Sequence, residues 1–506
     1  MRAIESCIED SMDLGGSEKA LIASANLSGS GDSEVSGAWP LLGQGTANSA
    51  EKTPLRLIAS IVALARSVRE HLSDPQSSHR QIAVGFLSVS FFVFIGKFAG
   101  AAKEMVVAWR YGVGETIDAY VFVFNMVNWP IAVWFNVMST VLIPLFVRLR
   151  AEDAVGLRVF RAELYGVTAL AGAALAALVG ALLSWTPFLA EASGLAPGAT
   201  RIAHEIVWPL ALCIPLALPI SVLACETMAQ RRHGNTLLEG VPALTLCFAV
   251  LLMGAWPAAA LSYGTLAGFC AQFGIMLWYL SCFDSIPRLR IGFSAFAWRP
   301  FRGVIATIVV AQIVNTLAAV IDPFWGARLG EGVIAAMSYA NRMLALLVGM
   351  GALAIGRAML PVLSGLECGD GPQRYRLSRL WASGLFALGA VCAAVIWISA
   401  PLLVRLVFER GAFIAADTAR VTEFLRWGLL QLPFYFGSLV WASQLNAARA
   451  YQLLFFGALG NLCVKVGGNE VASRLIGADG LYLATACMYC FSFIFYWFGA
   501  RRMTER

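Results

Sequence analysis

The chain has 506 residues, of which 59% are hydrophobic and 13% charged, and its net charge is +6. Soluble domains contain roughly 45–50% apolar and about 25% charged residues, so this composition excludes an ordinary soluble protein. The mean hydropathy of +0.71 indicates a membrane protein instead. Its arginines cluster in short loops between apolar stretches, which is typical of topology signals and speaks against nucleic-acid binding.

Two segments, 1–54 and 55–81, precede the first predicted span. The first is rich in Ser, Gly, Asp and Glu and has no hydrophobic region of a signal peptide, so we expect a disordered cytoplasmic tail. In the second, Leu57, Ile61 and Leu64 recur at helical spacing with charged residues between them. This pattern predicts an amphipathic interfacial helix followed by a linker, although a short helix in an unstructured tail fits it equally well.

From residue 82 onward the sequence predicts about twelve transmembrane helices, because about 20 apolar residues span the hydrocarbon layer as a helix. The predicted spans are 82–109, 118–147, 162–186, 202–228, 236–256, 260–282, 301–323, 332–362, 379–400, 420–446, 450–470 and 479–500. The basic connection at 283–302 divides them into an N-terminal lobe, 82–290, and a C-terminal lobe, 291–506, with six helices each. The fold class is therefore all-α and integral to the membrane.

Most of the arginines between the predicted spans and at the C-terminal end fall in alternate loops. These loops hold Arg148, Arg150, Arg158, Arg161, Arg231, Arg232, Arg288, Arg290, Arg299, Arg302, Arg374, Arg376, Arg379, Arg449, Arg501, Arg502 and Arg506. Loops with an excess of Lys and Arg stay in the cytoplasm. We therefore expect a multi-pass protein of a bacterial inner membrane with both termini in the cytoplasm.

An even number of spans in each lobe gives both lobes the same orientation, so any internal repeat should be parallel. Traces of one remain. Gly114, Glu115, Ala119 and Asn125 match Gly330, Glu331, Ala335 and Asn341, Pro144 matches Pro361, and Arg201 with Trp208 matches Arg420 with Trp427. A parallel pseudo-repeat favours an internally duplicated carrier over a channel or a scaffold.

Charged side chains interrupt two of the predicted spans. A charge in the hydrocarbon costs about 2.5–3.5 kcal/mol on insertion scales, so charges that remain there usually face an internal cavity. Lys97, Lys103 and Glu104 lie in the first span, and Arg342 lies in the eighth. Cations outnumber acids in this set, and we therefore expect a cavity that binds an anion through Lys97, Lys103 and Arg342.

Other polar residues could support this site. Glu104, Asn125 and Asn341 lie in the same two regions of the chain, and Arg357 lies nearer the cytoplasmic end of the eighth span. Structural interpretations stay open for each of them. Glu104 could pair with Lys103, Arg357 could extend to an interface, and the asparagines could hydrogen-bond neighbouring helices.

The sequence contains no signature of catalysis. There is no Walker-type loop, and the four histidines are scattered between the tail and the loops, so ATP hydrolysis, a metal site and His-based catalysis are not expected. No cofactor is expected either. Transport driven by an ion gradient, the membrane potential or substrate supply is what remains.

Several short runs resemble one known family. They are GKFAGAAKE (96–104), AWRYG (108–112), IDAY (117–120), YANR (339–342), MLP (359–361) and LVFERGAF (406–413). In order and spacing they are similar to the MviN/MurJ-type flippases of the multidrug/oligosaccharidyl-lipid/polysaccharide exporter (MOP) superfamily. The resemblance implies a V-shaped bundle of two six-helix lobes that moves an undecaprenyl-pyrophosphate-linked sugar to the periplasmic leaflet by alternating access.

The resemblance also implies roles for single residues. Cations in a central cavity hold the pyrophosphate in that family, and the matching positions here are Lys97, Lys103 and Arg342. Lysine at the first two positions keeps the charge but loses the forked geometry of arginine. Asp118 matches an acidic position at the start of the second span.

This chain also departs from the peptidoglycan flippases. Ile131, Ala132 and Val133 stand where those proteins have a basic pair, Asn136 stands near their acidic position, and two further C-terminal spans are absent. These differences favour a flippase for an exopolysaccharide or other surface glycan over one for the peptidoglycan precursor lipid II. Its expected partners are a lipid-linked glycan, membrane lipids, and glycosyltransferases or a polymerase of the same pathway.

Three alternatives stay open. The first is a lipid II flippase. The second is a proton- or sodium-coupled multidrug antiporter, which requires acidic residues in the N-terminal lobe, where only Glu104 and Glu226 qualify. The third is a non-transporting scaffold of a glycan-assembly complex, in which Lys97 and Arg342 could be replaced without effect.

Overall fold

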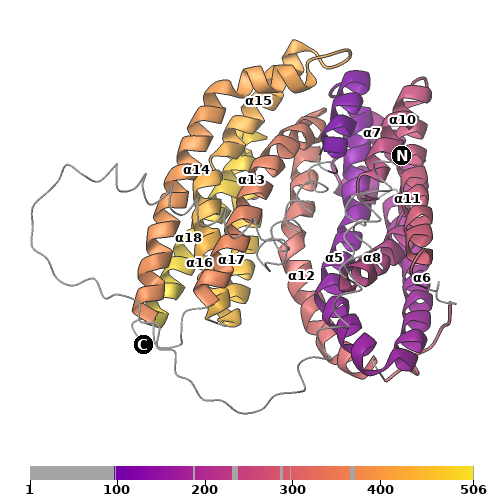
Figure 1. Ribbon diagram of the computed structural model, residues 1–506. Coiled ribbons are helices and arrows are strands. Elements are labelled where there is room, and N and C mark those ends of the chain that lie inside the picture. The colour runs from indigo at the N-terminus through magenta and orange to yellow at the C-terminus, as the bar shows by residue number, and fades with distance from the viewer. Residues whose placement is uncertain are drawn as a thin grey trace, which may run out of the picture. The chain divides into compact units, whose positions relative to one another are not determined.

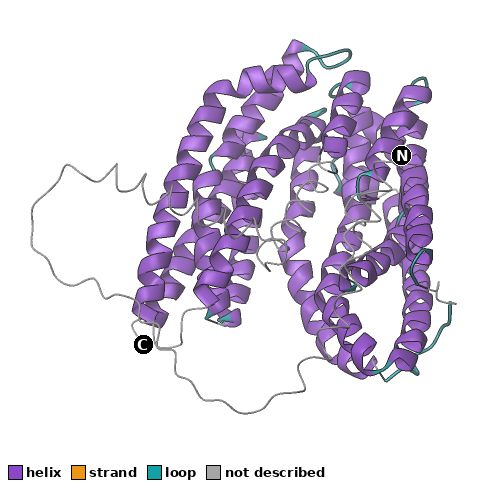
Figure 2. Cartoon of the chain, viewed as in Figure 1, coloured by secondary structure: helices purple, strands orange, loops and turns teal. Residues whose placement is uncertain are grey.

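The computed structural model describes residues 96, 98–185, 188–230, 238–284, 289–296, 298–364, 371–448 and 450–504. Figure 2 shows these residues as helices joined by short loops, with no strand among them. The predicted tail at 1–54, the predicted interfacial helix and linker at 55–81, and Lys97 lie outside the described residues.

The helices follow the predicted spans. The first half contains a helix at 98–111, α5 (Glu115–Glu152), α6 (Ala154–Ser184), the short π-helix η2 (Phe188–Ala192), α7 (Pro197–Ala211), α8 (Ile214–Ala229), α10 (Val241–Leu252) and α11 (Pro257–Ser281). The second half contains α12 (Trp298–Arg328), α13 (Val333–Ser364), α14 (Gly371–Phe408), α15 (Ala415–Leu429), α16 (Leu432–Ala447), α17 (Tyr451–Ile476) and α18 (Asp479–Thr504). Within the described residues, each predicted span coincides with a helix or a pair of helices; residues 82–95 of the first span lie outside them. The predicted all-helical fold is confirmed.

Several of these helices are long and apolar enough to cross a membrane by themselves. Among the described residues, α5, α6, α11, α14 and α18 meet this test by length and composition, and α7 with α8 meets it as a pair bent by 42°. A helix rises 1.5 Å per residue, so about 20 residues match the roughly 30 Å hydrocarbon layer. The longer helices, such as α5 with 38 residues, extend beyond that layer.

Two predicted spans are each broken into two helices at a proline. The ring of a proline clashes with the carbonyl four residues earlier, and the residue has no N–H to donate. α7 ends at Ala211, four residues before Pro215, and α15 ends at Leu429, four residues before Pro433. Both pairs consist of a 15-residue helix followed by a 16-residue helix. The two halves therefore repeat the same break in the same order, as a parallel pseudo-repeat requires.

A close helix contact is repeated at the same two prolines. A Cβ atom on Gly172 of α6 would lie 2.8 Å from Cα of Pro215, and one on Gly389 of α14 would lie 2.9 Å from Cα of Pro433. Only glycine permits this approach of two backbones. The same pair of neighbouring helices is thus held together in each half.

α12 contacts both halves of the chain, packing on α5 and on α17 (Figure 1). Trp129 of α5 donates a hydrogen bond from Nε1 to Oγ1 of Thr316 at 3.1 Å. Phe122 of α5 meets Phe324 edge to face, with 5.2 Å between the ring centroids. The first helix of the predicted C-terminal lobe therefore belongs to a core shared with the N-terminal half. The lobe boundary at 290 and 291 stays a prediction.

The connection that leads into α12 is fastened to α6 by a buried carboxylate. Glu163 accepts hydrogen bonds from the backbone N–H groups of Ser294 and Ala295, each at 3.1 Å, and from Nε1 of Trp298 at 2.8 Å. The ring of Trp298 also packs edge to face on Phe160, with 5.1 Å between the centroids. These contacts fix the start of α12 against the N-terminal half.

Candidate substrate-binding site

Three charged side chains from both halves of the chain meet in one cluster, which we name the Glu104 cluster: Lys103, Glu104 and Arg342. Nζ of Lys103 lies 2.9 Å from Oε1 of Glu104, and Nε of Arg342 lies 2.8 Å from the same oxygen. Lys103 and Glu104 belong to the helix at 98–111, whereas Arg342 belongs to α13. Two cations and one carboxylate leave the cluster with a net charge of +1.

The two cations of the cluster differ in exposure. The side chain of Lys103 is 14% exposed, but that of Arg342 is 52% exposed although Glu104 is buried. A guanidinium carries five N–H donors in a planar fork. Arg342 can therefore hold Glu104 with one edge and still offer donors to a ligand.

A small cavity lies against the cluster. Its volume is about 30 Å³, and its lining includes all three members of the cluster together with Asn125 and Tyr120. A space of this size holds about one water molecule. In this conformation the cavity is therefore too small for a sugar pyrophosphate.

The structure gives the other predicted site residues different positions. Asn125 lines the same cavity as the cluster. Asn341 is exposed beside Arg342 and does not line that cavity. Arg357 lies in α13, but its side chain, like the whole of Lys97, is outside the described part of the chain.

Asp118 makes contacts that serve to position α13. Its carboxylate is buried and accepts hydrogen bonds from the backbone N–H groups of Gly332, at 2.5 Å, and Ala335, at 2.7 Å. The first N–H groups of a helix lack partners within the helix, and an acidic side chain at that end also stabilises the helix dipole. Asp118 thus fastens the start of α5 to the start of α13, two to three turns before Arg342.

The loops at one end of the site join the two halves. The backbone N–H of Ala412 donates to the carbonyl of Trp109 at 2.8 Å, and the hydroxyl of Tyr339 donates to the carbonyl of Gly112 at 3.1 Å. Gly112 and Gly411 have φ angles of 60° and 61°, and a Cβ on Gly112 would lie 2.5 Å from the carbonyl oxygen of Ala412. Two of the runs that carry the family resemblance, 108–112 and 406–413, therefore form one contact.

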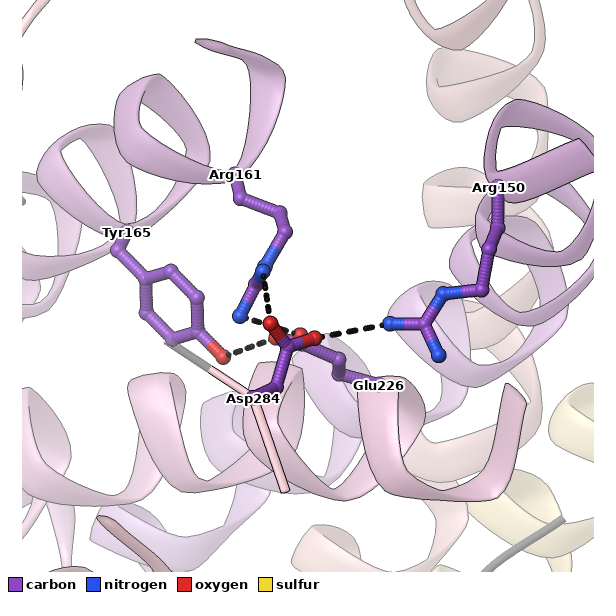
Figure 3. Close-up of polar contacts among 5 residues, drawn as sticks. All are labelled: Arg150, Arg161, Tyr165, Glu226 and Asp284. Atoms are coloured by element: carbon purple, nitrogen blue, oxygen red, sulfur yellow. Dashed lines mark hydrogen bonds and ion pairs between the residues drawn. The ribbon is translucent and has the colours of Figure 1, made fainter. Parts of the chain in front are cut away.

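The structure contains a second charged group that sequence reasoning missed (Figure 3), which we name the Arg161 cluster. Arg161 lies 2.6 Å from Oε1 of Glu226 and 3.3 Å from Oδ1 of Asp284, and Arg150 lies 2.9 Å from Oδ2 of Asp284. The hydroxyl of Tyr165 donates to Oε2 of Glu226 at 2.9 Å. Two cations and two carboxylates make this cluster neutral. It joins α5, α6, α8 and the end of α11.

The assignment of Arg161 to a loop was wrong. α6 begins at Ala154, so Arg161 lies in the second helical turn, and it is 3% exposed. Glu226, which the antiporter hypothesis needs as a cation ligand, is engaged by Arg161 and Tyr165. A carboxylate inside a predicted span, as Glu226 is near the end of 202–228, is a signal for such a partner, because a buried charge must be paired.

A buried cation also joins three helices of the second half. Nζ of Lys465 lies 2.8 Å from Oδ1 of Asp322 and 3.1 Å from the carbonyl oxygen of Leu481, and it also donates to Oγ1 of Thr485. Asn469 donates to the same Asp322 oxygen at 2.9 Å. Lys465 is thus paired with groups of α12 and α18 and has a structural role.

The family model described as "Lipid II flippase MurJ" matches residues 107–505. This chain belongs to the MurJ family. The lipid II flippase MurJ of Burkholderia cenocepacia is 24% identical over 432 residues, which cover 82% of this chain and 83% of the relative. A probable lipid II flippase MurJ of Thermotoga maritima is 22% identical over 422 residues, which cover 81% of this chain and 83% of that relative.

Solved structures share the fold of this MurJ-family chain. A lipid II flippase MurJ in an inward closed conformation superposes with a TM-score of 0.72 at 17% identity, covering 82% of this chain and 87% of that chain. A multidrug resistance transporter of the MATE family, inward-facing and from the MOP superfamily, gives a TM-score of 0.64 at 14% identity, covering 81% and 94%. The predicted MOP-type fold is confirmed.

Membership in the MurJ family also fixes the general class of activity. The chain is a transporter rather than an enzyme. It is a multi-pass protein of the inner membrane, and it is a flippase for a lipid-linked precursor.

Proposed function

We propose that this protein carries the peptidoglycan precursor lipid II across the inner membrane by alternating access, with the pyrophosphate of the substrate bound at the Glu104 cluster. The observation that carries this proposal is the position of Arg342 and Lys103 on either side of one carboxylate. One cation comes from each half of the chain. An anion bound there contacts both halves at once.

The charges of the cluster suit a pyrophosphate. Charge-assisted hydrogen bonds are roughly twice as strong as neutral ones, and a guanidinium can donate two of them in parallel to phosphate oxygens. The half-exposed Arg342 offers such donors, and Lys103 adds a second positive charge. Glu104 holds the two cations near each other and lowers their mutual repulsion while no substrate is present. The remaining charge of +1 attracts an anion to the cavity.

The glycan is assigned from the relatives. The sequence favoured a surface glycan because apolar residues replace a basic pair at 131–133. The relatives are named lipid II flippases, and this similarity supports the lipid II alternative better than the surface-glycan interpretation. Ile131 and Ala132 line a separate cavity of about 290 Å³ between α5, α8 and α11. Recognition of the pyrophosphate therefore depends on Lys103 and Arg342.

We also propose that both termini lie in the cytoplasm, because the arginine-rich loops alternate along the chain. The contact between 108–112 and 406–413 then lies toward the periplasm. It closes that side of the Glu104 cluster and must open for release. Single cysteines in that loop and in the connection at 289–296, labelled from each side of the membrane, test this orientation.

A translocation assay tests the proposal. The full-length protein is reconstituted into vesicles with lipid II in both leaflets, and the loss of inner-leaflet lipid II is measured with a lipid II-binding reagent added outside. We expect Arg342→Gln to reduce the translocation rate at least about tenfold, since about 1.4 kcal/mol corresponds to a factor of ten, and Arg342→Lys to retain more of it.

Arg201→Gln is the matched control. Arg201 pairs with Glu205 on the surface, with side chains 86% and 57% exposed, so its loss should leave translocation unchanged. Equal rates for Arg342→Gln and Arg201→Gln would overturn the proposal and support the scaffold hypothesis. If Arg342→Gln lowers the translocation rate of an undecaprenyl-pyrophosphate-linked surface glycan but not that of lipid II, the surface-glycan interpretation is restored.

A further inference from the structure

A second polar site lies in the second half of the chain, between α14 and α15. It is a groove of about 770 Å³ whose lining includes two tryptophans, Trp397 and Trp427, and the charged residues Arg405 and Arg426. Binding pockets for small molecules have about 300–1,000 Å³ and combine aromatic walls with a few polar groups. The groove therefore has the size and the lining of a ligand site.

The charges of this groove are balanced, unlike those of the Glu104 cluster. Glu409 and Glu423 also line it, so two carboxylates accompany its two guanidinium groups and the net charge is zero. Arg405 lies 3.6 Å from Glu409, whose second oxygen accepts a hydrogen bond from Thr418 at 2.7 Å. A neutral set of donors and acceptors selects a polyhydroxylated group over a simple anion, because hydroxyls both donate and accept.

Arg426 holds the ring of Trp397 in place at the wall of the groove. Nε of Arg426 donates to the backbone carbonyl of Trp397 at 3.2 Å, and its guanidinium lies 5.9 Å from the centroid of the Trp397 ring. Trp397 is 37% exposed. A tryptophan presents an apolar face beside a polar edge, which suits the faces of a sugar ring.

The α14 side of the groove runs beside an apolar stripe. Trp397, Pro401 and Arg405 line the groove at intervals of four residues. The stripe consists of exposed residues spaced by three or four positions on the same helix: Leu388, Val391, Val395, Ile398, Leu402 and Leu406. Residues at this spacing share one face of a helix. An amphipathic molecule can therefore place its polar part in the groove and its chain along the stripe.

The groove also adjoins the loops that close the Glu104 cluster. Glu409 belongs to the run 406–413, whose Ala412 binds the carbonyl of Trp109. Trp109 lies five residues after Glu104 on the same helix, about 8 Å along the axis at 1.5 Å per residue. Glu409 therefore links the groove to the contact that closes this side of the Glu104 cluster.

We infer that the groove between α14 and α15 binds the saccharide headgroup of a lipid-linked glycan, with the lipid chain against the apolar stripe of α14. This inference rests on the proposed function and extends it, because it gives the substrate a second site beyond the Glu104 cluster. The pyrophosphate is recognised at the first site and the sugar at the second.

A binding experiment on the full-length protein in phosphatidylcholine nanodiscs tests the inference. The probe is the soluble disaccharide di-N-acetylchitobiose, and saturation-transfer NMR measures its binding. We expect Trp397→Ala and Arg426→Gln each to weaken binding about tenfold, the effect of losing about one stacking contact or charge-assisted hydrogen bond. Trp256→Ala and Arg201→Gln are the matched controls, because Trp256 is 71% exposed outside the groove, and both should bind as the wild type does.

Two further measurements make each outcome decisive. Glu423→Gln keeps the shape of the groove, removes an acceptor charge and leaves an amide that can still hydrogen-bond Asp479, so it serves if Trp397→Ala does not fold. Nanodiscs that contain phosphatidylglycerol or phosphatidylethanolamine test whether a phospholipid headgroup occupies the groove. Absence of disaccharide binding, binding that none of the groove variants weakens, or displacement of the disaccharide by either phospholipid would overturn the inference.

The groove inference and the proposed function can fail independently, and the experiments tell the two failures apart. Arg342→Gln should reduce the translocation rate at least about tenfold and leave disaccharide binding intact. If translocation survives that change while the groove variants lose the disaccharide, the function proposal fails and the groove remains a saccharide site. If the groove variants bind and translocate normally while Arg342→Gln is inactive, only the groove inference fails.

Discussion

The Glu104 cluster and the Arg161 cluster contain the same kinds of charged groups, and they differ in balance and exposure. Around Glu104, two cations share one carboxylate and Arg342 remains 52% exposed. Around Arg161, two cations face two carboxylates, and Arg161 and Glu226 are almost fully buried. A buried neutral cluster has its charges satisfied by the protein itself. A partly exposed cluster with spare charge has donors left for a ligand, so we propose a structural role for the Arg161 cluster and a binding role for the Glu104 cluster.

The largest change in stability is expected at Arg161. Arg161→Gln leaves the buried Glu226 without its cation, and breaking a buried ion pair by removing one partner costs about 3–5 kcal/mol. Chemical unfolding of the purified full-length protein measures this loss. Arg158→Gln is the matched control, because Arg158 is exposed one turn earlier on α6. If Arg161→Gln lowers the free energy of unfolding no more than Arg158→Gln does, Arg161 does not have the structural role assigned to it.

A smaller loss in the free energy of unfolding is expected when Glu104 is replaced. Glu104→Gln leaves Lys103 and Arg342 without their carboxylate, but water can reach the half-exposed Arg342, so we expect about 1–3 kcal/mol. The charge of the cluster rises from +1 to +2. Inorganic pyrophosphate should therefore raise the melting temperature of this variant more than that of the wild type, which a thermal unfolding series measures. An equal shift in both proteins would show that pyrophosphate does not bind at this cluster.

Tyr165→Phe should have a more modest effect. The change removes one hydrogen bond to Glu226 and leaves the ion pair with Arg161 in place, so the free energy of unfolding should fall by about 1 kcal/mol. The same unfolding experiment measures it. A loss as large as that of Arg161→Gln would mean that the tyrosine, and not the arginine, dominates the stability of this cluster.

The smallest effect is expected for the exposed pair of Arg201 and Glu205, whose charged atoms lie 3.9 Å apart. Ion pairs on the surface contribute roughly 0–1 kcal/mol. Arg201→Gln should therefore change neither stability nor translocation measurably. A clear loss of stability or translocation would show that the exposure of a charged group does not predict how much its removal affects this protein.

The helices could be predicted from the sequence because long apolar runs leave few alternatives to a spanning helix. The breaks after Ala211 and Leu429 also have a local cause, the clash of Pro215 and Pro433 with the preceding turn. A proline in a span predicts either a kink or an end, however, and only the packed structure shows that both helices end.

The site could be predicted only in part. A charge at membrane depth is costly, and this cost singled out Lys97, Lys103, Glu104 and Arg342. The structure brings the last three together, and Lys97 lies outside the described residues. The pairing of Glu104 with Arg342 and the contact of Asp118 with the start of α13 join residues far apart in the chain. No local pattern encodes such pairs. Arg161 was assigned to a loop because α6 begins eight residues earlier than the predicted span.

Binding of lipid II to the purified full-length protein tests the central claim most directly. The comparison is between the wild type, the double variant Lys103→Gln/Arg342→Gln and the matched control Arg201→Gln. Each charge-assisted contact contributes about 1.5–3 kcal/mol, so the double variant should bind at least about a hundredfold more weakly. An affinity equal to that of Arg201→Gln would contradict the assignment of the Glu104 cluster as the pyrophosphate site.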